Sequence, residues 1–165
     1  MIAAVDVHYR NAQGIAACVL FPTWKAGTAT HAFVETIDQV EPYVPGQFYK
    51  RELPCIIRVL PRSPVPDVIV IDGFVWLGGE TPGLGAHLYE ALGRTTPVVG
   101  VAKTPYRGAG PLEQVFRGSS EKPLLVSVVG MPLSEAAQHI RGMHGKYRLP
   151  TMLSHVDRLC RRGNR

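Results

Sequence analysis

The amino-acid sequence predicts an α/β fold with one mixed sheet, in which an antiparallel meander leads into strand–helix–strand units and helices cover both faces. Three strand-like runs follow one another closely near the beginning of the chain. Further along, uninterrupted apolar runs rich in β-branched residues alternate with segments whose leucines recur at helical spacing. The first pattern is typical of antiparallel strands, and the second of a sheet flanked by helices.

The three N-terminal runs predict the meander. They read IAAVDVHY (residues 2–9), GIAACVLF (14–21) and ATHAFVETI (29–37), and the polar turn RNAQ joins the first two. Runs of this composition bounded by polar residues are strand signals. Because antiparallel strands need only short connections, these three are expected to be neighbours in the sheet.

A short helix is expected next. The stretch VEPYVPG predicts a turn, and residues 52–60 then carry apolar side chains at helical spacing. We expect Ile56, Ile57 and Val59 to face inward. The proline-rich stretch PRSPVP follows and should end the helix.

The second half predicts the strand–helix–strand units. The runs DVIVID (67–72), PVVGVAK (97–103) and PLLVSVVG (123–130) are continuously apolar, as in strands buried on both faces. Helices are expected over residues 83–92, over SEAAQHIRGMH after a Ser134 cap, and from Pro150 onward. The inward-facing residues of the first and last helices are predicted to be Leu84, Leu88, Leu92, Leu153, Val156 and Leu159.

Length and composition fit one packed domain spanning residues 1–165, with 45% hydrophobic and 19% charged residues. There are 18 Lys and Arg against 13 Asp and Glu, and the net charge of +5 is compatible with a polyanionic partner. Basic residues concentrate in YKRELPCIIRVLPR and in HVDRLCRRGNR. If both segments flank one cleft, they would form a track for phosphates.

Cysteine usage and hydropathy exclude several classes of protein. The three cysteines, Cys18, Cys55 and Cys160, are far apart and form no CxxC motif, which argues against a zinc ribbon or a disulfide framework. Cys18 and Cys55 have apolar neighbours and are expected in the core. The sequence shows no signal-peptide or transmembrane pattern, so we expect a cytoplasmic protein without a membrane partner.

Three acidic residues have positions that suggest chemistry. Asp6 lies within the first apolar run, Asp72 closes the run DVIVID, and Glu52 follows the turn-rich stretch. A buried carboxylate is costly unless a partner offsets its charge, and hard divalent cations prefer carboxylate oxygen. The three acids therefore suggest a magnesium site for phosphodiester chemistry. Spacing alone equally allows ordinary turns and helix caps, of which Asp72-Gly73 is a good example.

Five segments in order resemble the endonuclease V family, which has a ribonuclease H-like fold. They are VDVHY, PYVPGQFYKRE, VIVIDG, PVVGVAKTP, and PLLVSVVGMPLSEA followed by YRLP and a terminal helix. Each segment alone is a weak signal, but five in the same order are specific. The resemblance extends over nearly the whole chain, and it implies a monomeric, Mg²⁺-dependent repair endonuclease (Mn²⁺ being possible) that cleaves near inosine in DNA or RNA.

The resemblance also implies roles for individual residues. Asp6, Glu52 and Asp72 would be catalytic and would bind the metal, and Lys103 would reach the scissile phosphate or a metal-bound water. His155 lies near the place where the family supplies a last ligand. Because the family's spacing there is longer, Asp157 is the alternative.

Nucleic-acid contacts are implied at two places. Tyr43, with Pro45 and Gly46, matches the family's wedge-forming turn, and Lys50 and Arg51 follow it. The second place is the loop FVWLGGET, which contains Phe74 and Trp76 and directly follows Gly73. At this place the family has a Gly and a His-Pro-Arg stretch near the flipped base.

These departures leave the specificity open. The changed loop, together with Met131 in place of the family's His, indicates an intact reaction centre with an altered recognition surface. The alternatives are a nuclease of altered or structure-based specificity and a nucleic-acid-binding module that has lost turnover.

Overall fold

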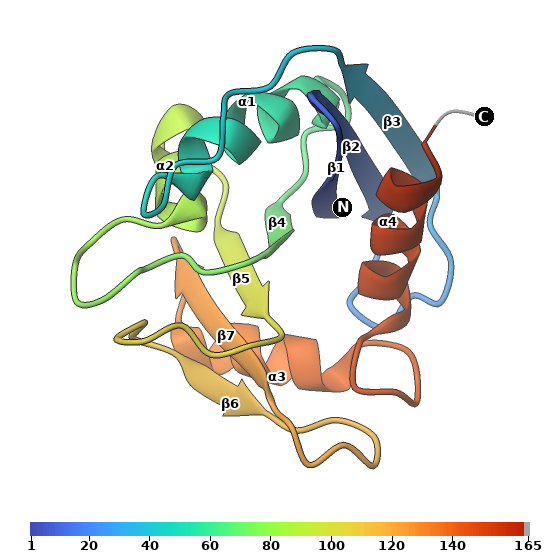
Figure 1. The fold of residues 1–165 in the computed structure, drawn as a ribbon. Helices are drawn as coiled ribbons and strands as arrows, with labels where there is room; N and C mark the ends of the chain where they lie inside the picture. The colour runs from blue at the N-terminus through green and yellow to red at the C-terminus, as the bar shows by residue number, and fades with distance from the viewer. Residues whose placement is uncertain (164–165) are drawn as a thin grey trace.

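The computed structural model describes residues 1–163, which form one seven-stranded mixed sheet in the order β3-β2-β1-β4-β5-β7-β6 and four helices (Figure 1). The elements are β1 (Ile2–Arg10), β2 (Gln13–Phe21), β3 (His31–Ile37), α1 (Phe48–Val59), β4 (Val68–Asp72), α2 (Leu84–Ala91), β5 (Val98–Ala102), β6 (Glu113–Val115), β7 (Leu124–Val129), α3 (Leu133–Gly142) and α4 (Thr151–Arg162). No helix in this part of the chain is long and apolar enough to cross a membrane.

The sheet confirms the predicted meander and its junction with parallel strands. β1 pairs antiparallel with β2, and β2 pairs antiparallel with β3. β1 also pairs parallel with β4, which pairs parallel with β5. β7 runs antiparallel to β5, and β6, which the sequence analysis did not identify, pairs antiparallel with β7. The sheet is therefore parallel only at its centre.

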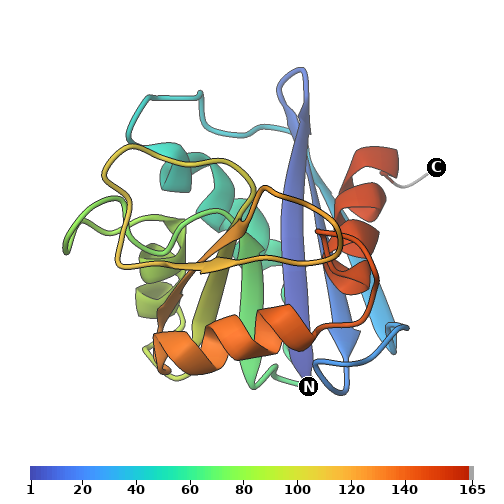
Figure 2. The ribbon, with the colours of Figure 1, turned by 90° about the horizontal axis from the view of Figure 1, so that it is seen from below.

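Helices cover both faces of the sheet, as predicted (Figures 1 and 2). On one face, α3 and α4 bury Ile140, Val156 and other apolar side chains against the sheet. On the other face, α1 and α2 contribute Ile56 and Leu88 to a second apolar cluster. Burial of these two apolar clusters stabilises the sheet and so fixes the positions of the strand ends described below.

Two details of the helices differ from the predictions. α1 begins at Phe48, so Glu52 lies within it, and its buried stripe consists of Glu52, Cys55, Ile56 and Val59. These positions follow the 3.6-residue repeat, which leaves Ile57 beside the stripe and 45% exposed. Ile57 was therefore wrongly predicted to face inward.

The Ser134 cap was also predicted wrongly. α3 begins at Leu133, and Pro132, two residues before Ser134, occupies the cap position without a side-chain hydrogen bond. Proline fits there because its fixed φ and missing N–H are compatible with the beginning of a helix. Cys18 and Cys55 lie in the core as predicted, and Cys160 is buried as well.

One buried arginine organises the connection between α3 and α4. Arg117 is 6% exposed, and its guanidinium donates hydrogen bonds to five backbone carbonyls in place of a carboxylate. The acceptors belong to Arg141, Met143, Gly145, Tyr147 and Arg148. Burial lowers the pKa of Arg117. The five acceptors satisfy the buried donors and fix the path of the chain into α4.

Candidate active site

Four carboxylates from four elements line one pocket, which we call the acidic pocket. Asp6 lies on β1 and Asp72 at the end of β4, and the parallel register Val5↔Ile71 brings these two strand positions to the same level. Glu52 comes from α1 and Asp157 from α4. All four line a cavity of about 420 Å³. Acids far apart in sequence are thus gathered by the central strands and by one helix from each face.

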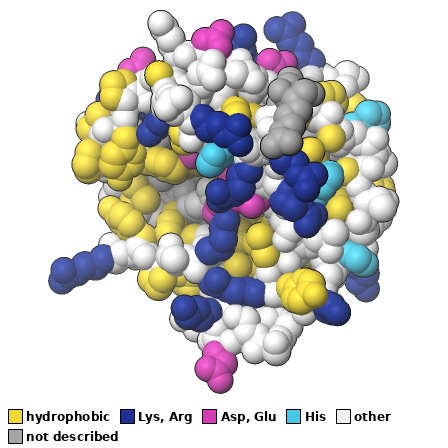
Figure 3. Space-filling model, turned by 45° about the vertical axis from the view of Figure 1, so that its right-hand side comes forward, with side chains coloured by type: hydrophobic (Ala, Val, Ile, Leu, Met, Phe, Trp, Pro, Cys, Tyr) yellow, Lys and Arg dark blue, Asp and Glu magenta, His cyan; other side chains and the backbone are white. Residues whose placement is uncertain are grey.

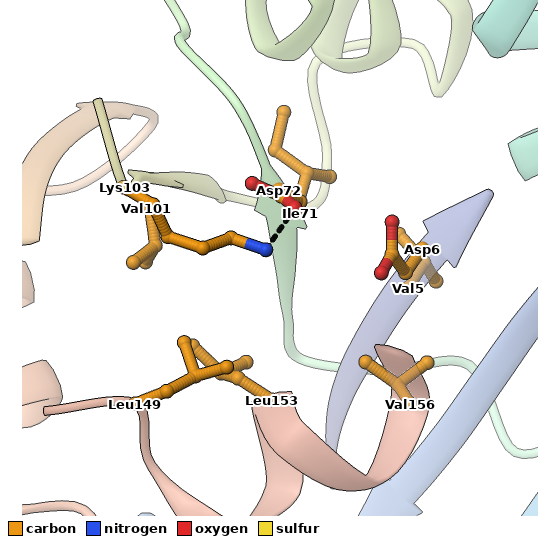
Figure 4. A pocket seen from close by; sticks show the side chains of 9 residues that line it. All are labelled: Val5, Asp6, Ile71, Asp72, Val101, Lys103, Leu149, Leu153 and Val156. Carbon is orange, nitrogen blue, oxygen red and sulfur yellow. Dashed lines mark ion pairs between the residues drawn. The ribbon is translucent and has the colours of Figure 1, made fainter. Parts of the chain in front are cut away.

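The close-up view shows Asp6 and Asp72 directed toward a common space (Figure 4). Beneath them lies a smaller apolar cavity, whose lining includes Leu149, Leu153 and Val156. These apolar side chains limit the water available to the carboxylates from below. The floor of the site therefore raises the cost of negative charge.

The pKa values of the acids reflect this cost. Burial, followed by the charge of Asp72, raises the pKa of Asp6 from 3.8 to about 7, although the backbone N–H of Val7 donates a 2.8 Å hydrogen bond to Asp6 Oδ1. Burial, followed by the charges of Asp6 and Asp72, raises the pKa of Glu52 well above its ordinary value. Perturbed carboxylates that repel one another in a cleft are a mark of a functional site.

Lys103 partly offsets the negative charge. It follows β5, the strand next to β4, and its Nζ lies 2.7 Å from Asp72 Oδ2. Burial opposes the charge of the ammonium group, but the hydrogen bond and the charge of Asp72 outweigh it and raise the pKa of Lys103. Arg148 donates to the Lys103 carbonyl and so fixes the backbone at this point. The Lys103 ammonium is therefore held beside Asp72 in the lining of the acidic pocket.

The chemistry of the donors fits a hard divalent cation. Every carboxylate in the pocket offers oxygen, the ligand that Mg²⁺ prefers, and a bound cation would offset the mutual repulsion of Asp6, Glu52 and Asp72. Within residues 1–163, no three His, Cys, Asp or Glu side chains are already drawn together closely enough to hold an ion. Because Lys103 pairs with Asp72 in this arrangement, metal binding would require the carboxylates to turn toward the ion.

The structure places Asp157, and not His155, at the acidic pocket. Asp157 Oδ1 accepts a 3.0 Å hydrogen bond from Arg161 Nε, and Asp157 lines the pocket together with Asp6. His155 lines a different cavity, on the other flank of α4. Two residues along a helix correspond to a rotation of about 200°, so the two side chains cannot serve the same site. The prediction that His155 completes the metal site therefore does not fit the structure.

An aromatic pocket adjoins the acidic pocket. It has a volume of about 280 Å³, and its rings come from Tyr43, Phe48, Tyr49, Phe74 and Tyr106. The rings of Phe74 and Tyr106 are 6.1 Å apart, and those of Tyr43 and Phe48 are 6.4 Å apart. Phe48, Gly73 and Phe74 line both pockets. If a nucleotide base bound between these aromatic side chains, the sugar–phosphate backbone attached to it would lie next to the carboxylates.

Glycines allow the loop after β4 to take this position. Gly73 has φ +134°, a conformation that L side chains rarely adopt. A Cβ on Gly100 of β5 would lie 2.5 Å from the Gly73 carbonyl oxygen, so only glycine permits this approach. Ser127 Oγ then accepts a 2.9 Å hydrogen bond from the backbone N–H of Val75. The two glycines and the serine hold Phe74 between the two pockets.

The other predicted nucleic-acid residues have different surroundings. Trp76 donates to the Val128 carbonyl at 3.1 Å and lines neither pocket. Pro45 is exposed and lines neither pocket, whereas Gly46 lines the aromatic one. Lys50 is exposed, and the guanidinium of Arg51 lies 3.8 Å from the centre of the Tyr9 ring. Trp76 thus packs on the sheet, where it cannot stack on a base in the aromatic pocket.

Sequence reasoning missed Phe48 and Tyr106, which line the aromatic pocket. Tyr106 follows the strand that carries Lys103 at its end, and ligands of α/β sheets bind at the carboxyl ends of strands. That rule could have identified Tyr106. Phe48 gave no comparable signal, because it stands in the first turn of a helix whose start was placed four residues too late.

Acids at adjacent strand ends beneath a basic surface are the arrangement expected of a metal-dependent nuclease. The space-filling view shows Lys and Arg side chains around the acids on this face (Figure 3). The model of the endonuclease V family matches residues 1–130. The chain therefore belongs to the endonuclease V family, whose members are hydrolases that act on nucleic acid.

Individual relatives agree with this assignment. Endonuclease V from Streptomyces avermitilis is 32% identical over 183 residues, with 98% of this chain and 79% of the relative covered. The crystal structure of endonuclease V from the same organism superposes with a TM-score of 0.77, at 28% identity and the same coverage of both chains. Endonuclease V from Ciona intestinalis, in complex with a 24mer DNA containing an inosine followed by a ribo-adenosine, is only 18% identical. It superposes with a TM-score of 0.84 over 98% of this chain and 84% of its own and confirms the ribonuclease H-like fold.

Proposed function

We propose that this protein is a metal-dependent endonuclease that cleaves a phosphodiester bond near inosine in DNA or RNA, and that residues 1–165 act as a single catalytic domain. The observation that carries the proposal is the convergence of Asp6, Glu52, Asp72 and Asp157 on one pocket beside an aromatic pocket. The first pocket suits the reaction and the second suits a base. A role in nucleic-acid repair follows from the same chemistry.

The acidic residues would hold the metal. Asp6, Glu52, Asp72 and Asp157 are the ligands for Mg²⁺, with Mn²⁺ as a substitute, because all four present carboxylate oxygen to the pocket. When bound, the metal supplies Lewis-acid stabilisation of the phosphate and a water of lowered pKa.

Lys103 would contribute directly as a protein group. Its raised pKa keeps the ammonium charged at neutral pH, and Lys103 lines the acidic pocket. An ammonium there would stabilise the negative charge that builds on the phosphate in the transition state. Its present partner, Asp72, would be released to the metal as Lys103 turns to the phosphate.

The surrounding residues would position the substrate. Tyr43 is 59% exposed at the rim of the aromatic pocket, where it can act as a wedge between stacked bases. A base flipped out of the strand would enter between Phe74 and Tyr106. Lys50, exposed in the first turn of α1, would contact the phosphates.

The test is incubation of the purified protein with labelled inosine-containing and unmodified strands of DNA and RNA, with Mg²⁺ or Mn²⁺. Cleavage close to inosine is expected, with no cleavage in EDTA. Binding without cleavage under every condition would favour the module that has lost turnover. Equal cleavage of inosine and unmodified strands would favour structure-based specificity. The monomeric state and the cytoplasmic location stay predictions.

A further inference from the structure

A third cavity lies on the opposite flank of α4 from the acidic pocket. It is a groove of about 520 Å³ between the β2–β3 loop and the first turns of α4, and we call it the histidine groove. Its hydrogen-bonding side chains are Thr28, Thr30, His31, Thr151, His155 and Arg158. Nothing in the proposed reaction uses these residues, and His155 is the side chain that sequence reasoning had assigned to the metal.

The groove has a fixed shape. The backbone N–H and the hydroxyl of Thr30 both donate to the Leu20 carbonyl, at 2.7 and 3.0 Å. Gly27 packs so closely on His144 that a Cβ would lie 3.1 Å from the imidazole ring. The same ring meets Thr151 Oγ1 at 2.9 Å through Nδ1. Both walls are therefore anchored, and a ligand would not have to order them.

The lining favours an anion. Arg158 is exposed and forms no ion pair with any residue in the range 1–163, and no carboxylate side chain is among the described residues that line the groove. The Arg158 guanidinium, the rings of His31 and His155 and the Thr28 hydroxyl offer hydrogen-bond donors. The Thr30 hydroxyl already donates to the Leu20 carbonyl, and Thr151 Oγ1 is in contact with His144. Such a set suits the oxygens of a phosphate, and without a carboxylate among the described lining residues it does not suit a hard cation such as Mg²⁺.

α4 connects this groove to the acidic pocket. The buried stripe of α4 includes Val156, so Asp157 and Arg161 project from one flank and His155 from the other. Arg158 lies about 200° from Val156 and therefore on the outer side of the helix. An α-helix with its side chains is about 10–12 Å wide, so a strand can cross it within a few nucleotides. Figure 3 shows histidine side chains beside Lys and Arg side chains at the edge of the face that holds the acids.

We propose that the histidine groove binds a backbone phosphate of the same nucleic-acid strand whose scissile bond lies in the acidic pocket, a few nucleotides along the chain. The proposal rests on the proposed function for the identity of the strand. Because phosphate contacts position a nucleic acid without reading its sequence, the groove would set the register of the flanking strand over α4. The enzyme would then bind long substrates better than short ones.

The experiment compares binding of two inosine-containing DNA strands in EDTA, one with long flanks on both sides and one truncated next to the inosine. Wild type, Arg158→Gln and His31→Gln are measured by fluorescence anisotropy over a range of salt concentrations. The matched control is Arg62→Gln, which removes the same charge from an exposed position in the segment that follows α1, on the other face of the sheet. For the long strand, Arg158→Gln should reduce the logarithmic salt slope by about 0.7–0.9, whereas His31→Gln should weaken binding without changing the slope, because it removes a hydrogen-bonding ring and no net charge. For the short strand, all variants should bind like wild type.

The outcomes separate this inference from the proposed function. Equal losses on both strands, or losses matched by Arg62→Gln, would overturn the groove as a phosphate site. Normal short-strand affinity shows that a variant is folded. Cleavage of the short inosine strand by wild type in Mg²⁺ is measured in parallel. If wild type fails to cleave but its long-strand advantage disappears in Arg158→Gln, the groove stands and the proposed reaction does not.

Discussion

At the scale of single residues, Asp6 connects stability with activity. Burial is the largest cause of the raised pKa of Asp6, and the negative charges of Asp72 and Asp157 raise it further. A protein has no structural reason to keep such a group, because the fold would be more stable with an apolar or amide side chain in its place. The cost is explained if the charge is needed for a cation.

Asp6→Asn should abolish cleavage while leaving nucleic-acid binding measurable. The amide has nearly the same shape but cannot supply the negative charge that the metal needs, whereas the basic residues that contact phosphates are unchanged. Cleavage in Mg²⁺ and binding by anisotropy are the two measurements. Wild-type cleavage by the purified variant would contradict the assigned role.

The same substitution should stabilise the metal-free protein at high pH. Because the folded-state pKa of Asp6, about 7, exceeds its ordinary value of 3.8, the folded protein keeps the proton at pH values where the unfolded chain has lost it. Stability is therefore lost as the pH rises between these two values, and an asparagine is not subject to this loss. In EDTA, Asp6→Asn should melt above wild type at pH 8 and together with it near pH 4.

Thermal melts at the two pH values test this expectation. About 1 kcal/mol corresponds to about 2–4 °C in a chain of this size. Added Mg²⁺ should reverse the order at pH 8, because only wild type gains the full binding free energy. A variant that melts below wild type at pH 8 in EDTA would show that the Asp6 charge is already compensated.

The last carboxylate can be tested against its neighbour on α4. Asp157→Ala should reduce the cleavage rate in Mg²⁺ by at least about tenfold, because it removes an oxygen ligand from the acidic pocket. His155→Ala should leave the rate on a short strand within about twofold, since His155 lies on the other flank of the helix. A larger effect of His155→Ala on that substrate would restore the sequence-based assignment.

At the scale of elements, the sequence predicted those whose signals are local. Continuous apolar runs identified β4, β5 and β7, and the family resemblance placed Asp6, Glu52, Asp72 and Lys103, whose side chains the structure brings to one pocket. The sequence patterns did not predict β6, because three residues are too few to show a pattern. They also did not predict the start of α1, because Phe48 follows a Pro-Gly turn closely and gives no helix signal of its own. The choice between His155 and Asp157 depended on which flank of α4 each side chain occupies. A comparison of residue spacing with that of the family could not decide this.

The loop after β4 has the largest consequence for specificity. It carries Phe74 into the aromatic pocket but directs the Trp76 ring N–H to the Val128 carbonyl. Stacking surfaces accept any base, whereas hydrogen-bonding pockets reject a wrong base strongly. We therefore expect a weaker or broader preference for inosine than a pocket built on polar groups would give.

Phe74→Ala and Tyr106→Ala should each weaken binding by about 1–3 kcal/mol, and by similar amounts for inosine and adenine strands. Trp76→Phe is the control, since it removes an indole N–H that lies outside the pocket. The cleavage-rate ratio of inosine to adenine in identical strands measures the preference. A ratio of several powers of ten would show that backbone groups near Tyr43 and Gly46 read the base instead.

At the scale of the whole molecule, the net charge of +5 overstates the charge available to a nucleic acid. Arg117 is used entirely on backbone carbonyls, and Arg148 spans two others. Arg161 is paired with Asp157, and Arg51 packs on Tyr9. The exposed cations around the site are fewer than composition suggests. Arg165, part of the predicted basic segment, lies outside the described residues.

Binding should therefore weaken with salt through a few identifiable contacts. Lys50 is exposed at the start of α1, and Arg162 is exposed in the last turn of α4. Each phosphate contact contributes about 0.7–0.9 to the logarithmic salt slope through the release of counterions. Lys50→Gln and Arg162→Gln should each reduce the slope by that amount. Arg51→Gln should instead lower the melting temperature, because its guanidinium covers the Tyr9 ring.

Arg94→Gln is the matched control for these variants. Arg94 lies in the turn after α2, its side chain is 68% exposed and 2.8 Å from Glu90 of that helix, and it does not line the acidic pocket, so its loss should leave the slope unchanged. Equilibrium binding of one inosine strand is measured in EDTA over a tenfold range of salt. An affinity that does not depend on salt would contradict the phosphate contacts and point to a small substrate. Equal slopes lost in Lys50→Gln and Arg94→Gln would show that binding responds only to total charge, in which case the basic residues around the pocket would have no positional role.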